Sequence, residues 1–286
     1  MTTLDARLHA FRPDLADARL EGKVEAACFV AGRPARISAA VADIRKAPGL
    51  VAGVDTQFLS GDDVTVFEDK DGWAWVQGER DSYVGYAASS MLGPRKEAPT
   101  HVVSVPRTFL YPGADLRFPP RGQLSMGCAV AVAGSAETRG TAYAMLASGE
   151  AVIARHLRPI ADRAADYVAI AEEFLGTPYL WGGASGFGID CSGLVQLSMR
   201  MAGRNAPRDT DMQAASLGEK LDPGAGFSGL RRGDLVFWKG HVAIMTDAGN
   251  MVHASGHTML VSREGLREAV DRIGYLYGGP TVFRRP

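Results

Sequence analysis

The 286-residue sequence has only three cysteines, Cys28, Cys128 and Cys191, and they lie far apart. They form no C-x-x-C motif and no disulfide framework, which suits a reducing compartment. No stretch approaches the roughly 18 apolar residues of a membrane span. The N-terminal stretch MTTLDARLHAFRPDLADARLEGKVEAA carries charges every few positions and lacks the apolar core of a signal peptide. We therefore expect a cytoplasmic protein.

The sequence also lacks an excess of either charge, with 31 basic and 32 acidic residues and a formal net charge of −1. It has no basic stripe with interleaved aromatic residues, so we expect neither a nucleic-acid partner nor binding to an anionic membrane. Hydrophobic residues make up 46% and charged residues 22%, which is typical of a globular protein. The length allows two or three domains.

The first half of the chain, over residues 35–157, has the pattern of short strands separated by turns. The segment DDVTVFEDKDGWAWVQ predicts a strand, a turn at Asp71-Gly72 and a second strand whose Trp73 and Trp75 share one face. An internal repeat at an offset of 66 residues predicts two small β-barrels of about 60 residues each, joined at 93–100. The repeat matches Ser38, Gln57, Gly61, Val64 and Val66 with Ser104, Gln123, Gly127, Val130 and Val132.

The pattern changes from about Pro159. The segment ADRAADYVAIAEEFLG predicts a helix that stops at Gly176, and apolar spacing predicts a second helix from Cys191 to Gly203. A polar loop at about 204–233 leads to GDLVFWKGHVAIMTDAGNMVHASG, which predicts three short strands joined by tight turns. We expect an α+β domain with helices first and an antiparallel sheet after them.

Cys191 is the candidate nucleophile because it stands where this second helix begins. Unpaired backbone N–H groups and the helix dipole favour negative charge at such a position, so a thiol ionises more easily there. The thiolate is the nucleophilic form of cysteine. The alternative is that Cys191 is a small buried hydrophobic residue.

A thiolate nucleophile needs a base, and the base needs a group that orients it. His241 and His253 on neighbouring predicted strands are the candidates. A three-residue loop at 247–249, with Gly249 in the left-handed conformation, is a favoured hairpin turn. It sets His253 opposite Ala243, so that both imidazoles lie on one face, roughly 7 Å apart.

Two alternatives to this pair are a purely structural role for each histidine and a zinc site. His253 and His257 stand four apart, which is a ligand spacing on a helix. The segment MVHASGH is strand-like and broken by Gly256, so the two rings would not share a helical face. We expect no metal and no other cofactor.

The motifs TPYLWGG, DCSGLVQ, RRGDLVFW, GHVAIM and HASG, in this order, resemble those of the NlpC-type papain-like cysteine peptidases of bacterial cell-wall metabolism. The resemblance covers about 165–285. It implies a papain-like α+β catalytic domain in which Cys191 is the nucleophile, His241 the general base and His253 the group orienting His241. Cys191 would form an acyl-enzyme, with its backbone N–H as an oxyanion donor. Tyr179 resembles the tyrosine beside the thiol, or is an ordinary loop aromatic.

More loosely, the whole chain resembles the subset with bacterial SH3-like modules before the catalytic domain. This implies cleavage after γ-D-glutamate in short murein peptides with a free N-terminal L-Ala, as in peptidoglycan recycling. Asp55 and Tyr83 look like the acid and tyrosine with which an SH3-like module holds the ammonium, although Asp55 is otherwise a turn acid. Asp190 and Ser192 are expected to bind the substrate ends, and Arg208 suits a carboxylate.

We thus expect an N-terminal extension at 1–34, SH3-like β domains at 35–97 and 98–158, and a papain-like peptidase domain at 159–286. Other functions stay open at this point. The chain could be a hydrolase of intact cell-wall peptidoglycan with SH3-like targeting modules, a non-catalytic peptide-binding protein, or a thiol-dependent hydrolase or acyl transferase acting on another substrate. The sequence does not distinguish diaminopimelate from lysine in the substrate, nor does it give the oligomeric state.

Overall fold

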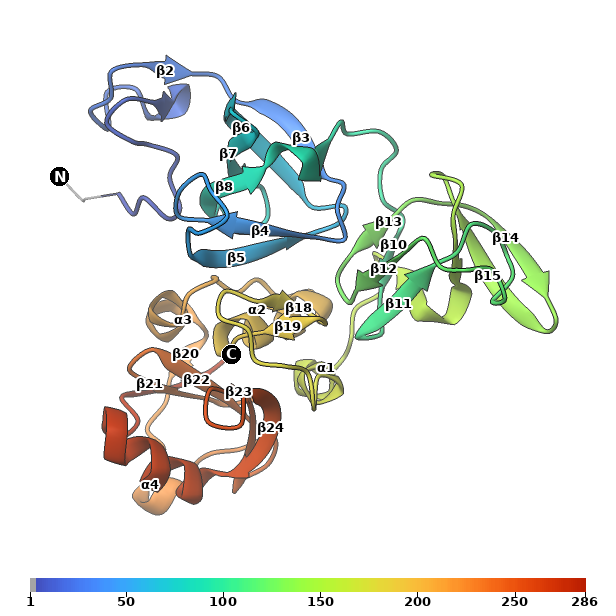
Figure 1. Cartoon of the computed structure of the whole chain (residues 1–286). Helices are drawn as coiled ribbons and strands as arrows, with labels where there is room; N and C mark the ends of the chain where they lie inside the picture. The colour runs from blue at the N-terminus through green and yellow to red at the C-terminus, as the bar shows by residue number, and fades with distance from the viewer. Residues whose placement is uncertain (1–3) are drawn as a thin grey trace. The chain divides into compact units, whose positions relative to one another are not determined.

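The computed structural model describes residues 4–286 and divides the chain into two compact units (Figure 1). The first unit ends at Asp162 and the second begins at Arg163. The predicted start of the peptidase domain, at 159, lies just before this division. Within the described residues, none of the helices combines the length and apolar character needed to cross a membrane.

The first β region of the first unit is a seven-stranded sheet in the order β5-β4-β8-β7-β6-β3-β9. Asp71 and Gly72 have φ of 53° and 81°, so both adopt the positive φ that a two-residue hairpin turn between β6 and β7 requires. Apolar residues such as Ile44, Phe58 and Val76 form the core on this sheet. The strands are β3 Arg33–Ile37, β4 Val41–Arg45, β5 Val54–Leu59, β6 Asp63–Lys70, β7 Trp73–Gly78, β8 Val84–Ala88 and β9 Leu92–Gly93, with the 3-10 helix η2 at Ser89–Met91.

The N-terminal segment, predicted as an extension, packs on this sheet. It contains β1 Ala16–Asp17, η1 Ala18–Leu20 and β2 Phe29–Val30. The Arg7 carbonyl accepts a hydrogen bond from the Val84 N–H at 2.8 Å. The Arg12 guanidinium lies 4.4 Å from the centroid of the Trp75 ring, beside a small core that includes Ala10. These contacts make the segment part of the first unit.

The second β region consists of three small sheets, ordered β13-β10-β17, β11-β12 and β14-β15-β16. Its strands are short, and its last strand is preceded by one 3-10 turn, η3 Ala154–His156. The strands are β10 His101–Val103, β11 Arg107–Leu110, β12 Gly122–Ser125, β13 Ala129–Val130, β14 Val132–Thr138, β15 Thr141–Leu146, β16 Ala151–Ile153 and β17 Leu157–Pro159.

The internal repeat has a counterpart in the backbone. Gly61 and Gly127 both have φ of 88°, a conformation that favours glycine. The Gly61 N–H donates to the Ile37 carbonyl and the Gly127 N–H to the Val103 carbonyl, each at 3.0 Å. The two β regions therefore share a turn at matching positions. Closure of each region into a barrel stays a prediction.

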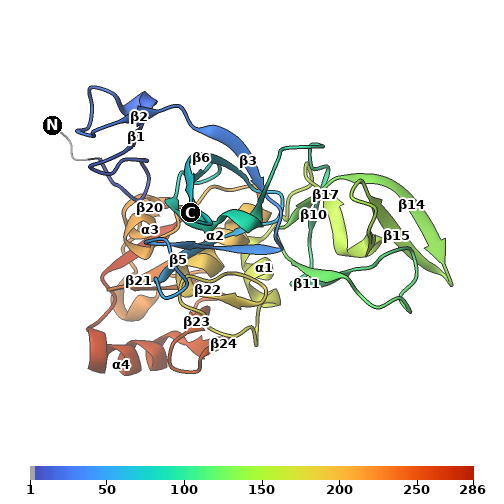
Figure 2. The ribbon, with the colours of Figure 1, turned by 45° about the horizontal axis from the view of Figure 1, so that its top comes forward.

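The second unit is built on a six-stranded antiparallel sheet in the order β20-β25-β21-β22-β23-β24. Helix α2 packs against β22 and β23, and α4 contacts β24 (Figure 2). Trp238, Met245, Leu266 and Ile273 belong to the core between the sheet and α4. The elements are α1 Tyr167–Glu173, β18 Ala184–Ser185, β19 Gly188–Ile189, α2 Cys191–Met201, α3 Thr210–Ser216, β20 Glu219–Lys220, η4 Ala225–Phe227, β21 Leu235–Trp238, β22 His241–Met245, β23 Asn250–Ser255, β24 Leu260–Gly265, α4 Leu266–Tyr277 and β25 Val282–Arg285.

Three expectations for this unit need correction. Helix α1 is shorter than predicted, because the Asp166 carboxylate caps it by accepting from the Val168 N–H at 2.8 Å. The polar segment predicted as a loop contains α3, whose Gln213 side chain is buried. Helix α4 follows the four strands β21 to β24, so the helices do not all precede the sheet.

Candidate active site

Cys191 is the first residue of α2, as the sequence predicts. The Asp190 carboxylate caps this helix by accepting a hydrogen bond from the Gly193 N–H at 2.7 Å. The backbone N–H groups of Val242 and Ser192 hydrogen-bond the Cys191 sulfur. Because Val242 follows His241 in β22, the first of these bonds holds the sulfur beside the strand that carries the candidate base.

The charge state of the sulfur differs from the expectation. Burial raises the pKa of Cys191 to about 12, and the nearby Asp190 carboxylate acts in the same direction. The Val242 and Ser192 N–H groups and the Arg208 guanidinium favour the thiolate but do not outweigh the loss of solvation. A position at a helix N-terminus therefore does not by itself ionise this thiol.

The two histidines come together through the hairpin between β22 and β23. The strands pair Ile244 with Val252, and the same register sets His253 opposite Ala243, as predicted. Nε2 of His241 lies 2.8 Å from Nδ1 of His253, and the ring centroids are 5.1 Å apart. The rings share one face and touch, closer than their backbone spacing alone suggests.

The loop that sets this register is closed differently from the prediction. Gly249 is not among the glycines with positive φ. Instead, Oδ1 of Asp247 accepts from the Gly249 N–H at 2.8 Å, the Asn250 N–H at 2.9 Å and Nδ2 of Asn250 at 3.1 Å. These bonds lower the pKa of Asp247. The Asp247 carboxylate therefore stabilises the turn, which does not depend on a positive φ at Gly249.

His241 is a neutral base in this environment. Burial lowers its pKa to about 3, and the neighbouring His253 and the Arg272 guanidinium act in the same direction. The Trp238 ring lies 5.7 Å from the His241 ring, centroid to centroid. Thiol and imidazole are therefore both uncharged near neutral pH, and the imidazole is free to accept a proton.

Two charged residues next to the histidine pair escaped the sequence reasoning, Glu264 of β24 and Arg272 of α4. Oε2 of Glu264 lies 3.1 Å from Nε2 of His253, and Arg272 forms an ion pair with the same carboxylate. Neither belongs to a motif that marks the site. The signal that could find them is strand pairing, because Ser262 lies opposite His253 and Glu264 follows two residues later on the same face.

Asp190, Ser192 and Arg208 form a buried cluster with one another. The Arg208 guanidinium, 1% exposed, donates to Oδ2 of Asp190 at 2.7 Å, to Oδ1 at 3.0 Å and to Oγ of Ser192 at 2.8 Å. Oδ2 of Asp190 also accepts from the Gly182 N–H at 3.0 Å. The carboxylate that Arg208 binds here is that of Asp190, so these contacts give the three residues a structural role. Their predicted contacts with the substrate stay a prediction.

Tyr179 lies in the loop before β18 and forms a parallel bridge with Ile189. Burial raises its pKa, and the nearby Cys191 sulfur and Asp190 carboxylate add to the shift, so its hydroxyl shares their surroundings. Asp55 lies in β5 of the first unit, with Oδ1 3.6 Å from Nζ of Lys46. Tyr83 packs in the core of the first unit. The part that Asp55 and Tyr83 play in the site stays a prediction.

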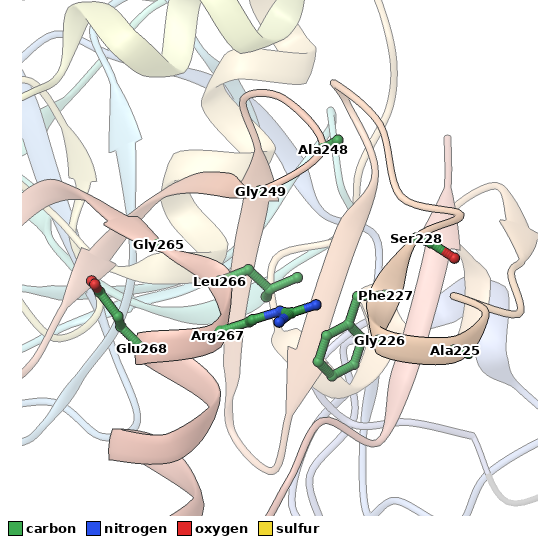
Figure 3. A pocket seen from close by; sticks show the side chains of 10 residues that line it. All are labelled: Ala225, Gly226, Phe227, Ser228, Ala248, Gly249, Gly265, Leu266, Arg267 and Glu268. Atoms are coloured by element: carbon green, nitrogen blue, oxygen red, sulfur yellow. The ribbon is translucent and has the colours of Figure 1, made fainter.

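The second unit also contains a cavity of about 410 Å³ between η4, the loop before β23 and the start of α4 (Figure 3). Phe227 and Arg267 approach each other across it, and Glu268 points away from both. None of the predicted site residues lines this cavity. Over residues 4–286, no three His, Cys, Asp or Glu side chains gather into a potential metal site, and His257 lies in the turn after β23.

Two segments of the chain match known protein families. Residues 176–270 match the NlpC/P60 family, and residues 44–92 match the bacterial dipeptidyl-peptidase SH3 domain. The chain therefore carries an NlpC/P60 family domain, with a papain-like fold, preceded by an SH3-like domain.

Two curated relatives are both named γ-D-glutamyl-L-lysine dipeptidyl-peptidase. The protein from Bacillus subtilis is 38% identical over 99 residues, which are 32% of this chain and 32% of that protein. The protein from Bacillus cereus is 38% identical over 104 residues, which are 34% of this chain and 29% of that protein. The chain thus matches about a third of the length of these relatives.

One solved structure extends the likeness of fold to most of the chain. The crystal structure of an NlpC/P60 family protein from Bacillus cereus covers 88% of this chain and 99% of its own chain. The TM-score is 0.73 at 23% sequence identity, so this likeness concerns the fold alone.

Proposed function

We propose that this protein is a cysteine endopeptidase that hydrolyses the γ-D-glutamyl–diamino acid bond of short murein peptides with a free N-terminal L-Ala. The observation that carries the proposal is the buried Cys191 thiol at the start of α2, hydrogen-bonded by Val242 beside a contacting His241–His253 pair. The SH3-like match and the names of the two curated relatives support the substrate class. The same substrate class supports a role in cytoplasmic recycling of murein peptides.

In the proposed mechanism, deprotonation of the Cys191 thiol and attack by its sulfur take place in one step. Nε2 of His241 faces His253, so Nδ1 is the nitrogen left for the thiol. Because both groups start uncharged, Nδ1 takes the proton from the Cys191 sulfur as the sulfur attacks the γ-carbonyl carbon. The Cys191 backbone N–H, at the first position of α2, is the proposed donor to the oxyanion.

The remaining steps return the enzyme to its starting state. The protonated His241 gives its proton to the amine nitrogen of the diamino acid as the C–N bond breaks, which leaves a thioester on Cys191. Water then attacks the thioester carbon and gives a proton to His241, and the sulfur leaves as thiol after taking that proton back. In the proposal Asp55 and Tyr83 bind the substrate ammonium, and Tyr179 contacts the reacting group near the sulfur.

The test compares L-Ala-γ-D-Glu-diaminopimelate with the same peptide acetylated at its N-terminus. We expect hydrolysis of the free amine only, loss of turnover in Cys191→Ala and strong weakening in Asp55→Ala. Cys28→Ala removes an exposed thiol of the first unit and serves as the matched control with full activity. Cleavage of both peptides at equal rates contradicts the specificity, and no cleavage of either contradicts the proposed function. Release of peptides from whole sacculi identifies a hydrolase of intact peptidoglycan instead.

A further inference from the structure

His253 has a charged neighbour, Glu264, on the side away from His241. The His253 side chain is 1% exposed, and its Nε2 atom lies 3.1 Å from Oε2 of Glu264. Among the residues that the structure describes, Nε2 of His253 has no other polar partner, so the Glu264 carboxylate is the group that it faces, at ion-pair distance. Both side chains project from the same face of the β23–β24 ladder.

Arg272 fixes the position of the Glu264 carboxylate. Its Nε and Nη2 atoms donate to the two oxygens of Glu264 at 2.9 and 2.5 Å, in the paired geometry that guanidinium and carboxylate prefer. The contact with His253 and the hydrogen bonds from Arg272 lower the pKa of Glu264 to about 2. The carboxylate therefore stays ionised and can only accept hydrogen bonds over the working range of pH.

The contact between the two rings limits where their protons can be. A neutral imidazole has one N–H and one acceptor nitrogen, so one ring must donate across the 2.8 Å gap between Nε2 of His241 and Nδ1 of His253. If His241 donates, its Nδ1 is an acceptor and the proton of His253 is on Nε2, facing Glu264. If His253 donates, Nδ1 of His241 carries a proton and cannot accept one from the thiol.

The Glu264 carboxylate favours the first of these two proton arrangements. An ionised carboxylate 3.1 Å away attracts a proton on Nε2 of His253 and repels a lone pair there. It also stabilises the positive charge that forms on His241 during attack, since it acts on the pKa of His241 in the raising direction. The charged and titratable groups that act on His241 are His253, Glu264 and Arg272.

We propose that Glu264, held by Arg272, is a positioning residue that keeps the His253 proton on Nε2 and thereby leaves Nδ1 of His241 free to take the thiol proton. The inference rests on the proposed function and extends the Cys191–His241–His253 set by two residues that touch neither substrate nor sulfur. The assignment of the His253 proton to Nε2 describes the protein before the substrate binds.

The first test reads the tautomers directly. In protein labelled with ¹⁵N-histidine, with the His253 signals assigned by loss in His253→Gln, we expect His253 to be protonated at Nε2 in the wild type. In Glu264→Gln, whose amide offers both a donor and an acceptor, we expect part of the population to shift to Nδ1. A wild-type His253 protonated at Nδ1, or tautomers unchanged in Glu264→Gln, would overturn the inference.

The second test separates positioning from folding. We expect Glu264→Gln to lower kcat by about 10- to 100-fold with KM changed by less than about twofold, because tautomer control affects proton transfer and not binding. Glu264→Asp, which keeps the charge, should recover part of the loss. Glu268→Gln, an exposed acid in the first turn of α4, is the matched control and keeps wild-type kcat. An equal loss in Glu268→Gln, or an effect on KM alone, would contradict the proposal.

The two tests also separate this inference from the proposed function. If the wild type does not cleave the murein peptide, the proposed function fails, and the NMR result still decides the tautomer. If Glu264→Gln does not fold, Arg272→Gln takes its place, because it frees the Glu264 carboxylate from α4 without altering the acid. We then expect a smaller fall in kcat and a mixed His253 tautomer. A wild-type kcat together with a wild-type His253 tautomer in Arg272→Gln would overturn the inference.

Discussion

Nε2 of His241 and Nδ1 of His253 lie 2.8 Å apart although 12 positions separate the two residues in the chain. The distance follows from the length of the loop between β22 and β23, because a loop longer or shorter by one residue would turn one ring to the other face of the sheet. The contact also decides which nitrogen of His241 is available to Cys191. The chemistry of the site therefore depends on a turn that does not touch the substrate.

In the enzyme without substrate, Cys191 should be an uncharged thiol near neutral pH. With the pKa of Cys191 raised to about 12 and that of His241 lowered to about 3, the sulfur is protonated and the imidazole neutral between these values. The thiolate fraction then grows about tenfold per pH unit. We expect the rate of Cys191 alkylation by a small reagent, followed by mass spectrometry, to rise steadily between about pH 6 and 9. A rate that is already level from about pH 5 would instead show a thiolate–imidazolium pair.

A histidine variant checks the same point independently. If the resting pair is neutral, His241→Ala abolishes turnover but leaves alkylation of Cys191 at pH 7 within about threefold of the wild type. If the resting pair is ionic, losing the imidazolium lowers the alkylation rate much further. Cys191→Ala provides the background labelling of the other two cysteines.

Arg208→Gln should strongly destabilise the second unit. The substitution leaves the Asp190 carboxylate buried without its cation, which costs about 3–5 kcal/mol in the free energy of unfolding. Urea denaturation at neutral pH measures this loss. Adding Asp190→Asn should recover part of it, since the uncompensated charge is then gone. Arg263→Gln, which breaks an ion pair of Glu172 with a 57% exposed arginine, should cost less than about 1 kcal/mol.

The loop between β22 and β23 should depend on Asp247 and not on Gly249. Asp247→Ala removes the acceptor for the N–H groups of Gly249 and Asn250, and we expect a loss of about 1 kcal/mol in urea denaturation. A Cβ at Gly249 would meet only Oδ1 of Asp247, at 3.8 Å, so Gly249→Ala should change stability by less than about 0.5 kcal/mol. The pKa of Asp247 is lowered in the folded state, so its contribution is present above the usual carboxyl pKa and lost as the pH falls. The reverse order of the two variants would contradict this assignment.

The sequence predicted those parts of the site that depend on local spacing. The start of α2 at Cys191 follows from helical periodicity, and the shared face of His241 and His253 follows from the number of loop residues. The charge state of Cys191 could not be predicted, because burial depends on how distant segments cover the sulfur. The pairing of Arg208 with Asp190, 18 residues away, depends on the same kind of packing.

The limits of the fold prediction have similar causes. Helix α3 is only seven residues long, and Gln213 is its one buried side chain, so it has no apolar stripe to mark it. Glu264 and Arg272 come from a strand and a helix that no motif connects to His253, and only the pairing of β23 with β24 brings them together. By contrast, Asp71-Gly72 was recognisable because a two-residue hairpin demands positive φ at both positions.

One carboxylate, that of Asp190, fastens the loop at Gly182, the first turn of α2 at Gly193 and the guanidinium of Arg208 at the same time. A substitution of Asp190 would remove the hydrogen bonds to all three segments at once. A substitution of Arg208 would leave the buried Asp190 carboxylate without its cation. We therefore expect evolution to select against a substitution at only one of the two positions. Among homologous sequences, replacements at 190 and 208 should arise jointly or not at all.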